Sequence, residues 1–214
     1  MRYPTFCLAL LVLLWSLLAL SPHSRETWLH ENLLVFAGVP FVVWLHGRLG
    51  FTHLSVTLLT LFFSLHLVGA HYTYSDVPLF ERADGRNHYD RVVHFSFGLL
   101  LAQPARELFR RAAHARGFWS YFFPLSLVMA FSMLYELIEW GFVLVAAPEE
   151  GMTFLGTQGD EWDAQKDMGL ASLGALLAMG AALLVDARRQ PGFADEFRVS
   201  LGGTPRQKRT DQKT

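Results

Sequence analysis

Residues 118–147 read FWSYFFPLSLVMAFSMLYELIEWGFVLVAA, and the only charged side chains in this run are Glu136 and Glu139. A helix needs about 20 mostly apolar residues to cross the hydrocarbon core of a bilayer, whereas an apolar run of about 10 to 14 residues is more typical of a buried helix in a soluble protein. The stretch therefore predicts a transmembrane helix, and its length allows the helix to tilt or to project from the membrane.

Further apolar blocks on both sides of this stretch predict an all-α fold, a polytopic transmembrane helical bundle of about six helices. Hydrophobic residues make up 52% of the chain and charged residues 17%, against about 25% charged residues in typical soluble domains. We expect residues 1–190 to form this membrane domain and residues 191–214 to form a polar, disordered cytoplasmic tail. The expected helices lie near residues 4–20, 29–46, 51–70, 89–109, 118–147 and 164–185.

The first apolar block is compatible with either a retained helix or a secretory signal peptide. Arg2 precedes the block, and Ala19-Leu20-Ser21 resembles a cleavage site of small residues. The apolar run is long for a signal peptide, however, and Pro22 would follow the cut. We therefore expect a retained helix, and cleavage would leave five helices without moving the others.

Basic residues near the helix ends predict the orientation, because cytoplasmic loops carry an excess of Lys and Arg. The segment after the fourth expected helix and the C-terminal tail are rich in Arg and Lys, whereas residues 148–163 contain acidic residues and neither basic type. An even number of helices then places both termini in the cytoplasm. The net charge of −1 gives no basic surface for nucleic acid, so the lipid bilayer is the expected partner.

Ionisable side chains gather where the last three expected helices approach the outer surface, and each costs about 2.5 kcal/mol or more within a membrane. Imidazole and carboxylate groups on facing helices of a bundle suit a divalent metal such as Zn, Mn or Fe. Asp90 and Asp160 are expected to act as a general base or to hydrogen-bond a ligand residue. The expected metal ligands are His94, Glu136, Glu139, Asp163 and Asp167.

Three hypotheses for the function of this cluster stay open at the level of sequence. A bound metal would activate water for hydrolysis of a lipid-linked or small polar ligand near the membrane surface. An ion-coupled transporter would use the acids as a proton or cation relay. In a structural network, Arg91 and Lys166 would neutralise two of the acids. The carboxylates outnumber the local cations, which favours a bound metal, a cationic ligand or raised carboxyl pKa values.

Several motifs resemble those of a known family: His71-Tyr72-Thr73-Tyr74, Tyr89-Asp90-Arg91 with His94-Phe95, Tyr135-Glu136-Leu137 with Glu139-Trp140, and Gly156-Thr157-Gln158-Gly159-Asp160 followed by Trp162-Asp163-Ala164-Gln165-Lys166-Asp167-Met168. They resemble the YjdF-type bacterial inner-membrane proteins, which are defined by a domain of unknown function. The resemblance spans roughly residues 30–185. It implies a multi-pass protein of the bacterial inner membrane and assigns no activity.

A second, weaker similarity rests on a pattern of three parts: a helix with an acidic residue, a loop, and a helix of small residues that begins with aspartates. The residues that carry this pattern are Glu136, Asp163, Asp167 and Gly174. This order is similar to that of VanZ-type membrane proteins, and it implies a role in the cell envelope. The chain departs from that pattern, because those proteins have Gln after the acidic residue and Asn after the second aspartate.

Overall fold

The computed structural model describes residues 2–78, 80, 85–146 and 158–204, and within these ranges it contains helices and no strand. The expectation of an all-α membrane bundle is confirmed. Four helices, α2, α3, α5 and α7, are long and apolar enough to cross a membrane. The bounds are α1 (Tyr3–Leu18), α2 (Arg25–Leu49), α3 (His53–His71), α4 (Tyr89–Ala112), α5 (Trp119–Ala146), α7 (Asp163–Arg189) and α8 (Phe193–Ser200).

The two remaining long helices are less typical of membrane spans. Helix α1 is apolar but has only 16 residues. Helix α4 has 24 residues and carries charged side chains at both ends. Helices α1 and α4 each contain or overlap one of the six expected segments. Helix α4 lies among the other helices and not at the edge of the bundle, because it packs against α3, α5 and α7. Arg106 and Glu107 of this helix are therefore buried in protein, whereas Arg110 and Arg111 in its last turn are exposed.

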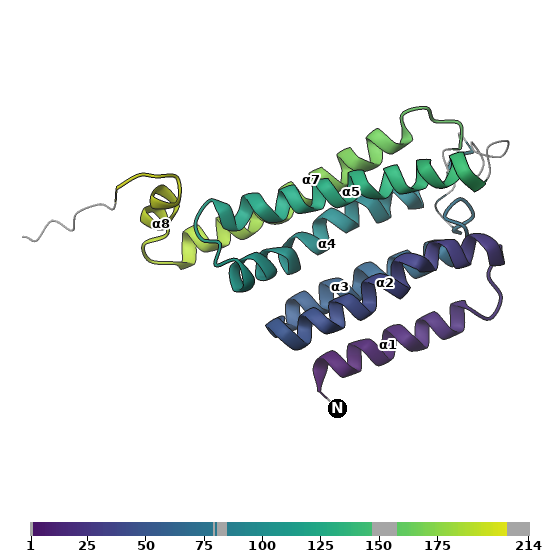
Figure 1. Cartoon of the computed structure of the whole chain (residues 1–214), viewed down its shortest axis with the longest axis horizontal. Coiled ribbons are helices and arrows are strands. Elements are labelled where there is room, and N and C mark those ends of the chain that lie inside the picture. The colour runs from purple at the N-terminus through teal and green to yellow at the C-terminus, as the bar shows by residue number, and fades with distance from the viewer. Residues whose placement is uncertain (1, 79, 81–84, 147–157, 205–214) are drawn as a thin grey trace, which may run out of the picture.

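The bundle has two halves, which Figure 1 shows as α1, α2 and α3 on one side and α4, α5 and α7 on the other. Contact between α3 and α4 joins the halves, and the closest packing within the second half is between α4 and α7. Helix α1 begins at the end of the bundle where α8 lies. The described chain thus starts and finishes at the same end.

Local sequence signals account for the turn between α2 and α3. Gly50 ends α2 in the left-handed conformation, with φ of 68°, which glycine adopts without strain. The side chain of Thr52 then caps α3 by accepting a hydrogen bond from the backbone N–H of Ser55. Glu107 of α4 accepts a further bond, at 2.9 Å, from the Thr52 N–H. The turn is therefore held by both of its flanking helices and by the second half of the bundle.

Small residues allow the close approach of α4 and α7. Gly98 of α4 faces the carbonyl of Ala171, and Gly174 of α7 faces the carbonyl of Phe95. Ala171 and Ala175 are completely buried in this contact. Because small side chains let two helix backbones meet in a membrane, this pair of helices forms the most tightly packed part of the fold.

The beginning of the C-terminal tail differs from the expected disorder, because residues 193–200 form α8. Phe193 and Phe197 are one helical turn apart, so they share a face, and Phe197 packs against the ring of Phe118 with centroids 5.9 Å apart. Ser200 accepts a hydrogen bond of 2.9 Å from the backbone N–H of Phe118. Residues 205–214 lie outside the described part of the chain, and their disorder stays a prediction.

Candidate functional site

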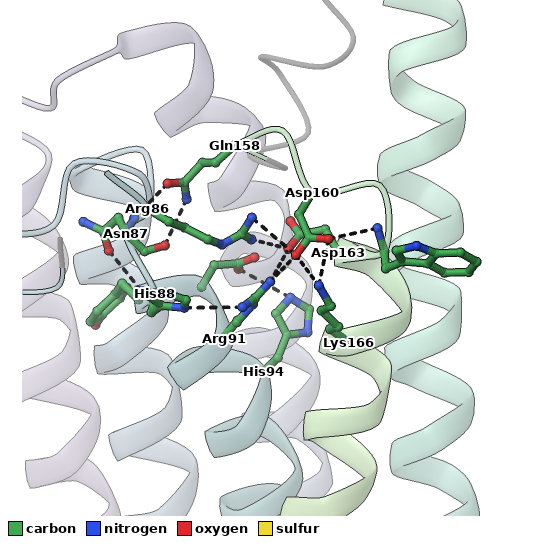
Figure 2. A network of polar contacts seen from close by, with 12 residues as sticks. Arg86, Asn87, His88, Arg91, His94, Gln158, Asp160, Asp163 and Lys166 are labelled. Carbon is green, nitrogen blue, oxygen red and sulfur yellow. Dashed lines mark hydrogen bonds and ion pairs between the residues drawn. The ribbon is translucent and has the colours of Figure 1, made fainter. Parts of the chain in front are cut away.

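A group of ion pairs joins the segment before α4 to the start of α7 (Figure 2), and we name it the ion-pair layer: Arg86, Arg91, Asp160, Asp163 and Lys166. Arg91 Nη2 lies 2.5 Å from Asp160 Oδ2 and 3.4 Å from Asp163 Oδ1. Arg86 also bonds Asp163, and Lys166 Nζ lies 2.6 Å from Asp160 Oδ2. Three cations thus surround two carboxylates, so the layer carries no excess of negative charge.

Hydrogen bonds between side chains and the backbone fix the two segments that supply this layer. Asn87 and Gln158 bond reciprocally: the Asn87 N–H donates to Gln158 Oε1 at 2.8 Å, and Gln158 Nε2 donates to the Asn87 carbonyl at 3.0 Å. Figure 2 shows both residues beside Arg86. The side chain of Asn87 also accepts a bond from the N–H of Tyr89 at 3.0 Å, which helps to begin α4.

The hydrogen bonds from Lys166 and Arg91 lower the pKa of Asp160 to about 2, against about 3.9 for an unperturbed aspartate. Because the pKa is lower in the folded state, the Asp160 carboxylate stabilises the fold above about pH 4, and this contribution is lost as the pH falls towards about 2. We expect Asp160→Asn to lower the melting temperature at about pH 6 and to approach the wild type at about pH 2.5.

Thermal unfolding in mild detergent, followed by circular dichroism at several pH values, tests this prediction. Glu161→Gln is the matched control, because Glu161 is the exposed neighbour and no ion pair is found for it in the described ranges. A difference between Asp160→Asn and the wild type that persists unchanged to the lowest pH would contradict the assigned role of the Asp160 carboxylate.

Next to this layer, four side chains form what we name the acidic cluster: Asp90, His94, Glu136 and Asp167. Asp90 and His94 are four residues apart on α4, so they share a helix face. His94 Nε2 lies 3.5 Å from Asp90 Oδ1 and 3.6 Å from Glu136 Oε1 of α5. Single ligand atoms of Asp90, His94 and Asp167 all lie within 4.8 Å of one another. Three helices thus contribute to one cluster.

The acidic cluster contains buried oxygen atoms without hydrogen-bond partners. Asp167 is 2% exposed, and its Oδ1 has no partner within the described part of the protein, as is also true of Glu136 Oε1. A buried carboxylate oxygen without a partner is costly and calls for a proton, a water or an ion. Since one imidazole faces three carboxylates, the cluster has the composition of a cation site.

The seven residues expected at the site are divided among three places in the structure. His94, Glu136 and Asp167 lie together, and Asp90, expected as a base, lies among them. Asp163, expected as a ligand, belongs to the ion-pair layer with Asp160. Glu139, also expected as a ligand, lines a cavity beside the cluster.

This cavity has a volume of about 620 Å³ and lies between the two halves of the bundle, where Asp90 and His94 form part of its wall. Tyr135 of α5 donates a hydrogen bond of 3.2 Å to Glu31 Oε2 of α2. His66 of α3 bonds the carbonyl of Glu31 through Nε2 at 3.0 Å and the hydroxyl of Tyr74 through Nδ1 at 2.6 Å. Because a carbonyl only accepts, Nε2 of His66 donates and Nδ1 accepts from Tyr74.

Glu31 and His66 of the cavity are not among the seven residues expected from the sequence. Glu31 lies near the start of the second expected helix, which is the most polar of the apolar blocks. A carboxylate at the end of an expected span is typical of the membrane interface and does not by itself indicate a site. The signal that would have identified it is an acidic residue within an expected membrane span. Its distance in sequence from Tyr135, 104 residues, hides the contact.

Residues 3–188 match the model of a family described as "Predicted membrane protein (DUF2238)". The chain is 40% identical over 163 residues to "Inner membrane protein YjdF" of Escherichia coli strain K12, which covers 73% of this chain and 78% of that relative. No solved structure shows significant similarity to the chain. These matches confirm the resemblance to YjdF-type proteins and support a multi-pass protein of the bacterial inner membrane. The chain therefore belongs to the DUF2238 family of predicted membrane proteins.

Proposed function

We propose that this inner-membrane protein binds a divalent cation in the acidic cluster, with Asp90, His94, Glu136 and Asp167 as its ligands. The observation that carries the proposal is Asp167, whose buried Oδ1 has no described hydrogen-bond partner and which offers a ligand atom within 4.8 Å of those of Asp90 and His94. A divalent cation would neutralise the excess carboxylate charge. One nitrogen and several oxygen ligands suit Zn, Mn or Fe.

The cavity suggests the chemistry that such a cation would perform. Asp90 and His94 belong both to the acidic cluster and to the cavity wall, so a cation held there would face the cavity. A divalent cation polarises bound water and makes it a nucleophile at neutral pH. The arrangement therefore supports metal-assisted hydrolysis of a ligand that reaches the cavity from near the membrane surface.

The ion-pair layer supports this proposal by positioning Asp167. Asp163 lies one turn before Asp167 on α7 and is bonded to Arg86 and Arg91. These bonds hold the start of α7 against α4, and they place Asp167 opposite His94. The basic side chains thus have structural partners of their own, and in the described part of the chain no arginine or lysine forms an ion pair with the acidic cluster.

We also propose that residues 1–190 form the membrane domain and that both termini are cytoplasmic. Arg110, Arg111, Arg188 and Arg189 lie in the last turns of α4 and α7. These helix ends lie at the end of the bundle where α1 begins (Figure 1). An excess of basic residues at one end supports its cytoplasmic placement, and the acidic cluster would then lie near the periplasmic surface.

Metal analysis of the purified protein in mild detergent tests the cation site. We expect about one equivalent of Zn, Mn or Fe in the wild type and loss of the metal in the double variant His94→Ala, Asp167→Asn, because two ligands are removed. The matched control is His53→Ala, Asp195→Asn, which changes the same residue types outside the acidic cluster and should keep the metal.

Two other outcomes would overturn the proposal in favour of the alternatives. Absence of metal from the wild type even after incubation with each cation, together with a lower melting temperature of the double variant, would indicate a structural polar network. Absence of metal together with proton-coupled uptake in vesicles would indicate a transporter. The position of the cavity between the two halves of the bundle is the observation that favours this second candidate.

A further inference from the structure

The cavity has a strongly acidic lining that the proposed cation site does not fully use. Its acidic lining residues are Glu31, Asp76, Asp90 and Glu139, and no Lys or Arg belongs to the described lining. Asp90 belongs to the acidic cluster, and Asp76 is exposed and lies near His23. Glu31 of α2 and Glu139 of α5 are therefore the two carboxyl groups left to meet a ligand, and their oxygen acceptors suit a cationic hydrogen-bond donor.

The rest of the lining is aromatic and aliphatic. Phe62, Phe97 and Tyr135 line the cavity beside the two carboxylates. Aromatic faces attract cations, and apolar side chains accommodate a hydrocarbon chain. The lining thus combines a place for a positive head group with a place for an apolar tail, which is the composition expected for an amphiphile.

The cavity also reaches the surface that faces lipid. Phe131, Leu134 and Ile138 of α5 belong to its lining and are 52%, 48% and 56% exposed. Helices α2 and α5 flank this side without close packing between their described residues, and the hydrogen bond from Tyr135 to Glu31 links them. A ligand dissolved in the bilayer can therefore enter sideways between α2 and α5.

A buried hydroxyl group provides a second sign of a ligand. Ser132 of α5 lines the cavity and is only 2% exposed, yet its Oγ has no hydrogen-bond partner in the described ranges. Buried hydroxyl groups are normally hydrogen-bonded. A polar group of a bound molecule would supply the missing bond.

We propose that this cavity binds an amphiphile with a primary ammonium head group, which enters from the bilayer between α2 and α5. The ammonium group binds at Glu31 and Glu139, because its three N–H donors match carboxylate acceptors. The apolar chain lies along Phe131, Leu134 and Ile138 towards the lipid. The ammonium site uses other carboxylates than the cation site, which borders the same cavity, and it does not depend on metal.

Photolabelling with a dodecylamine that carries a diazirine group tests this proposal in the full-length protein, purified in mild detergent and treated with a chelator. We expect labelled residues, mapped by mass spectrometry, on the cavity face of α5 between Phe131 and Glu139. The double variant Glu31→Gln, Glu139→Gln should reduce this labelling about tenfold, which corresponds to about 1.4 kcal/mol of binding free energy. Because metal is removed, failure of the cation proposal leaves the result unaffected.

Two controls keep the test decisive if the double variant does not fold. Ile138→Trp fills the lateral opening and should reduce labelling, whereas Leu137→Trp places the same ring on an exposed neighbour outside the cavity lining and should not. A dodecanol carrying the same diazirine group should label weakly. Equal labelling by the amine and the alcohol, or equal labelling of the two tryptophan variants, would overturn the proposal.

Discussion

Gly98→Ala is expected to destabilise the protein by about 2 to 3 kcal/mol, in the range found for overpacked cores. A Cβ at Gly98 would lie 1.8 Å from the carbonyl oxygen of Ala171 and 2.7 Å from its carbon. These are backbone atoms of α7, so no rotamer change relieves the overlap and α4 must move away from α7. The usual gain from replacing glycine by alanine within a helix, about 1 kcal/mol, is too small to offset this cost.

Reversible unfolding in mixed micelles of mild and denaturing detergent measures this loss. Gly180→Ala is the matched control on α7, because a Cβ there meets no atom within 4 Å, and it should leave stability unchanged or raise it by up to about 1 kcal/mol. Equal stability of the two variants would contradict the close contact between α4 and α7. Because that contact also holds His94 opposite Asp167, Gly98→Ala should weaken any metal binding as well.

Arg106→Ala is expected to cost about 3 to 5 kcal/mol, the range for a buried ion pair that loses one partner. Arg106 is buried and bonds Asp186, and its guanidinium lies 4.4 Å from the centroid of the Tyr121 ring. Tyr121 donates a 2.6 Å hydrogen bond to Asp186 Oδ2. Without Arg106, the Asp186 carboxylate would stay buried between α4, α5 and α7 with one neutral partner.

The same unfolding assay separates this buried pair from a surface pair. Arg198 and Asp195 form an ion pair whose side chains are 46% and 48% exposed, so Arg198→Ala should cost less than about 1 kcal/mol. The double variant Arg106→Ala, Asp186→Ala should be less destabilised than Arg106→Ala alone, because it leaves no uncompensated charge. If Arg106→Ala lowers the free energy of unfolding no more than Arg198→Ala does, the ion pair between Arg106 and Asp186 contributes little to stability.

The helix positions were predictable because membrane insertion depends on local composition. Within lipid, every backbone polar group needs an internal partner, so a long apolar run has few choices besides a helix. The run 118–147 contains α5, Trp119–Ala146. The same reasoning failed for residues 193–200, where a short helix forms because Phe193 and Phe197 pack against the start of α5. Hydropathy does not report such a contact.

Part of the candidate site was predictable, because some of its residues are one turn apart on the same helix. Asp90 and His94 share a face of α4 by their separation of four residues, and the same holds for Asp163 and Asp167 on α7. The sequence predicted the same role, that of a metal ligand, for Asp163 and Asp167. The structure gives them different environments, since Arg86, 77 residues away, bonds Asp163, while Asp167 Oδ1 faces the acidic cluster without a described partner.

By itself, the sequence determined that the chain crosses a membrane as helices, where those helices lie and which residues carry charge into them. These properties depend on composition and on spacing within one helix, and lipid enforces them segment by segment. Only the tertiary structure decided which charges neutralise one another, because that depends on how α2, α4, α5 and α7 pack. It joined Glu31 to Tyr135, surrounded Asp160 with Arg91 and Lys166, and left buried oxygens of Glu136 and Asp167 without a described hydrogen-bond partner.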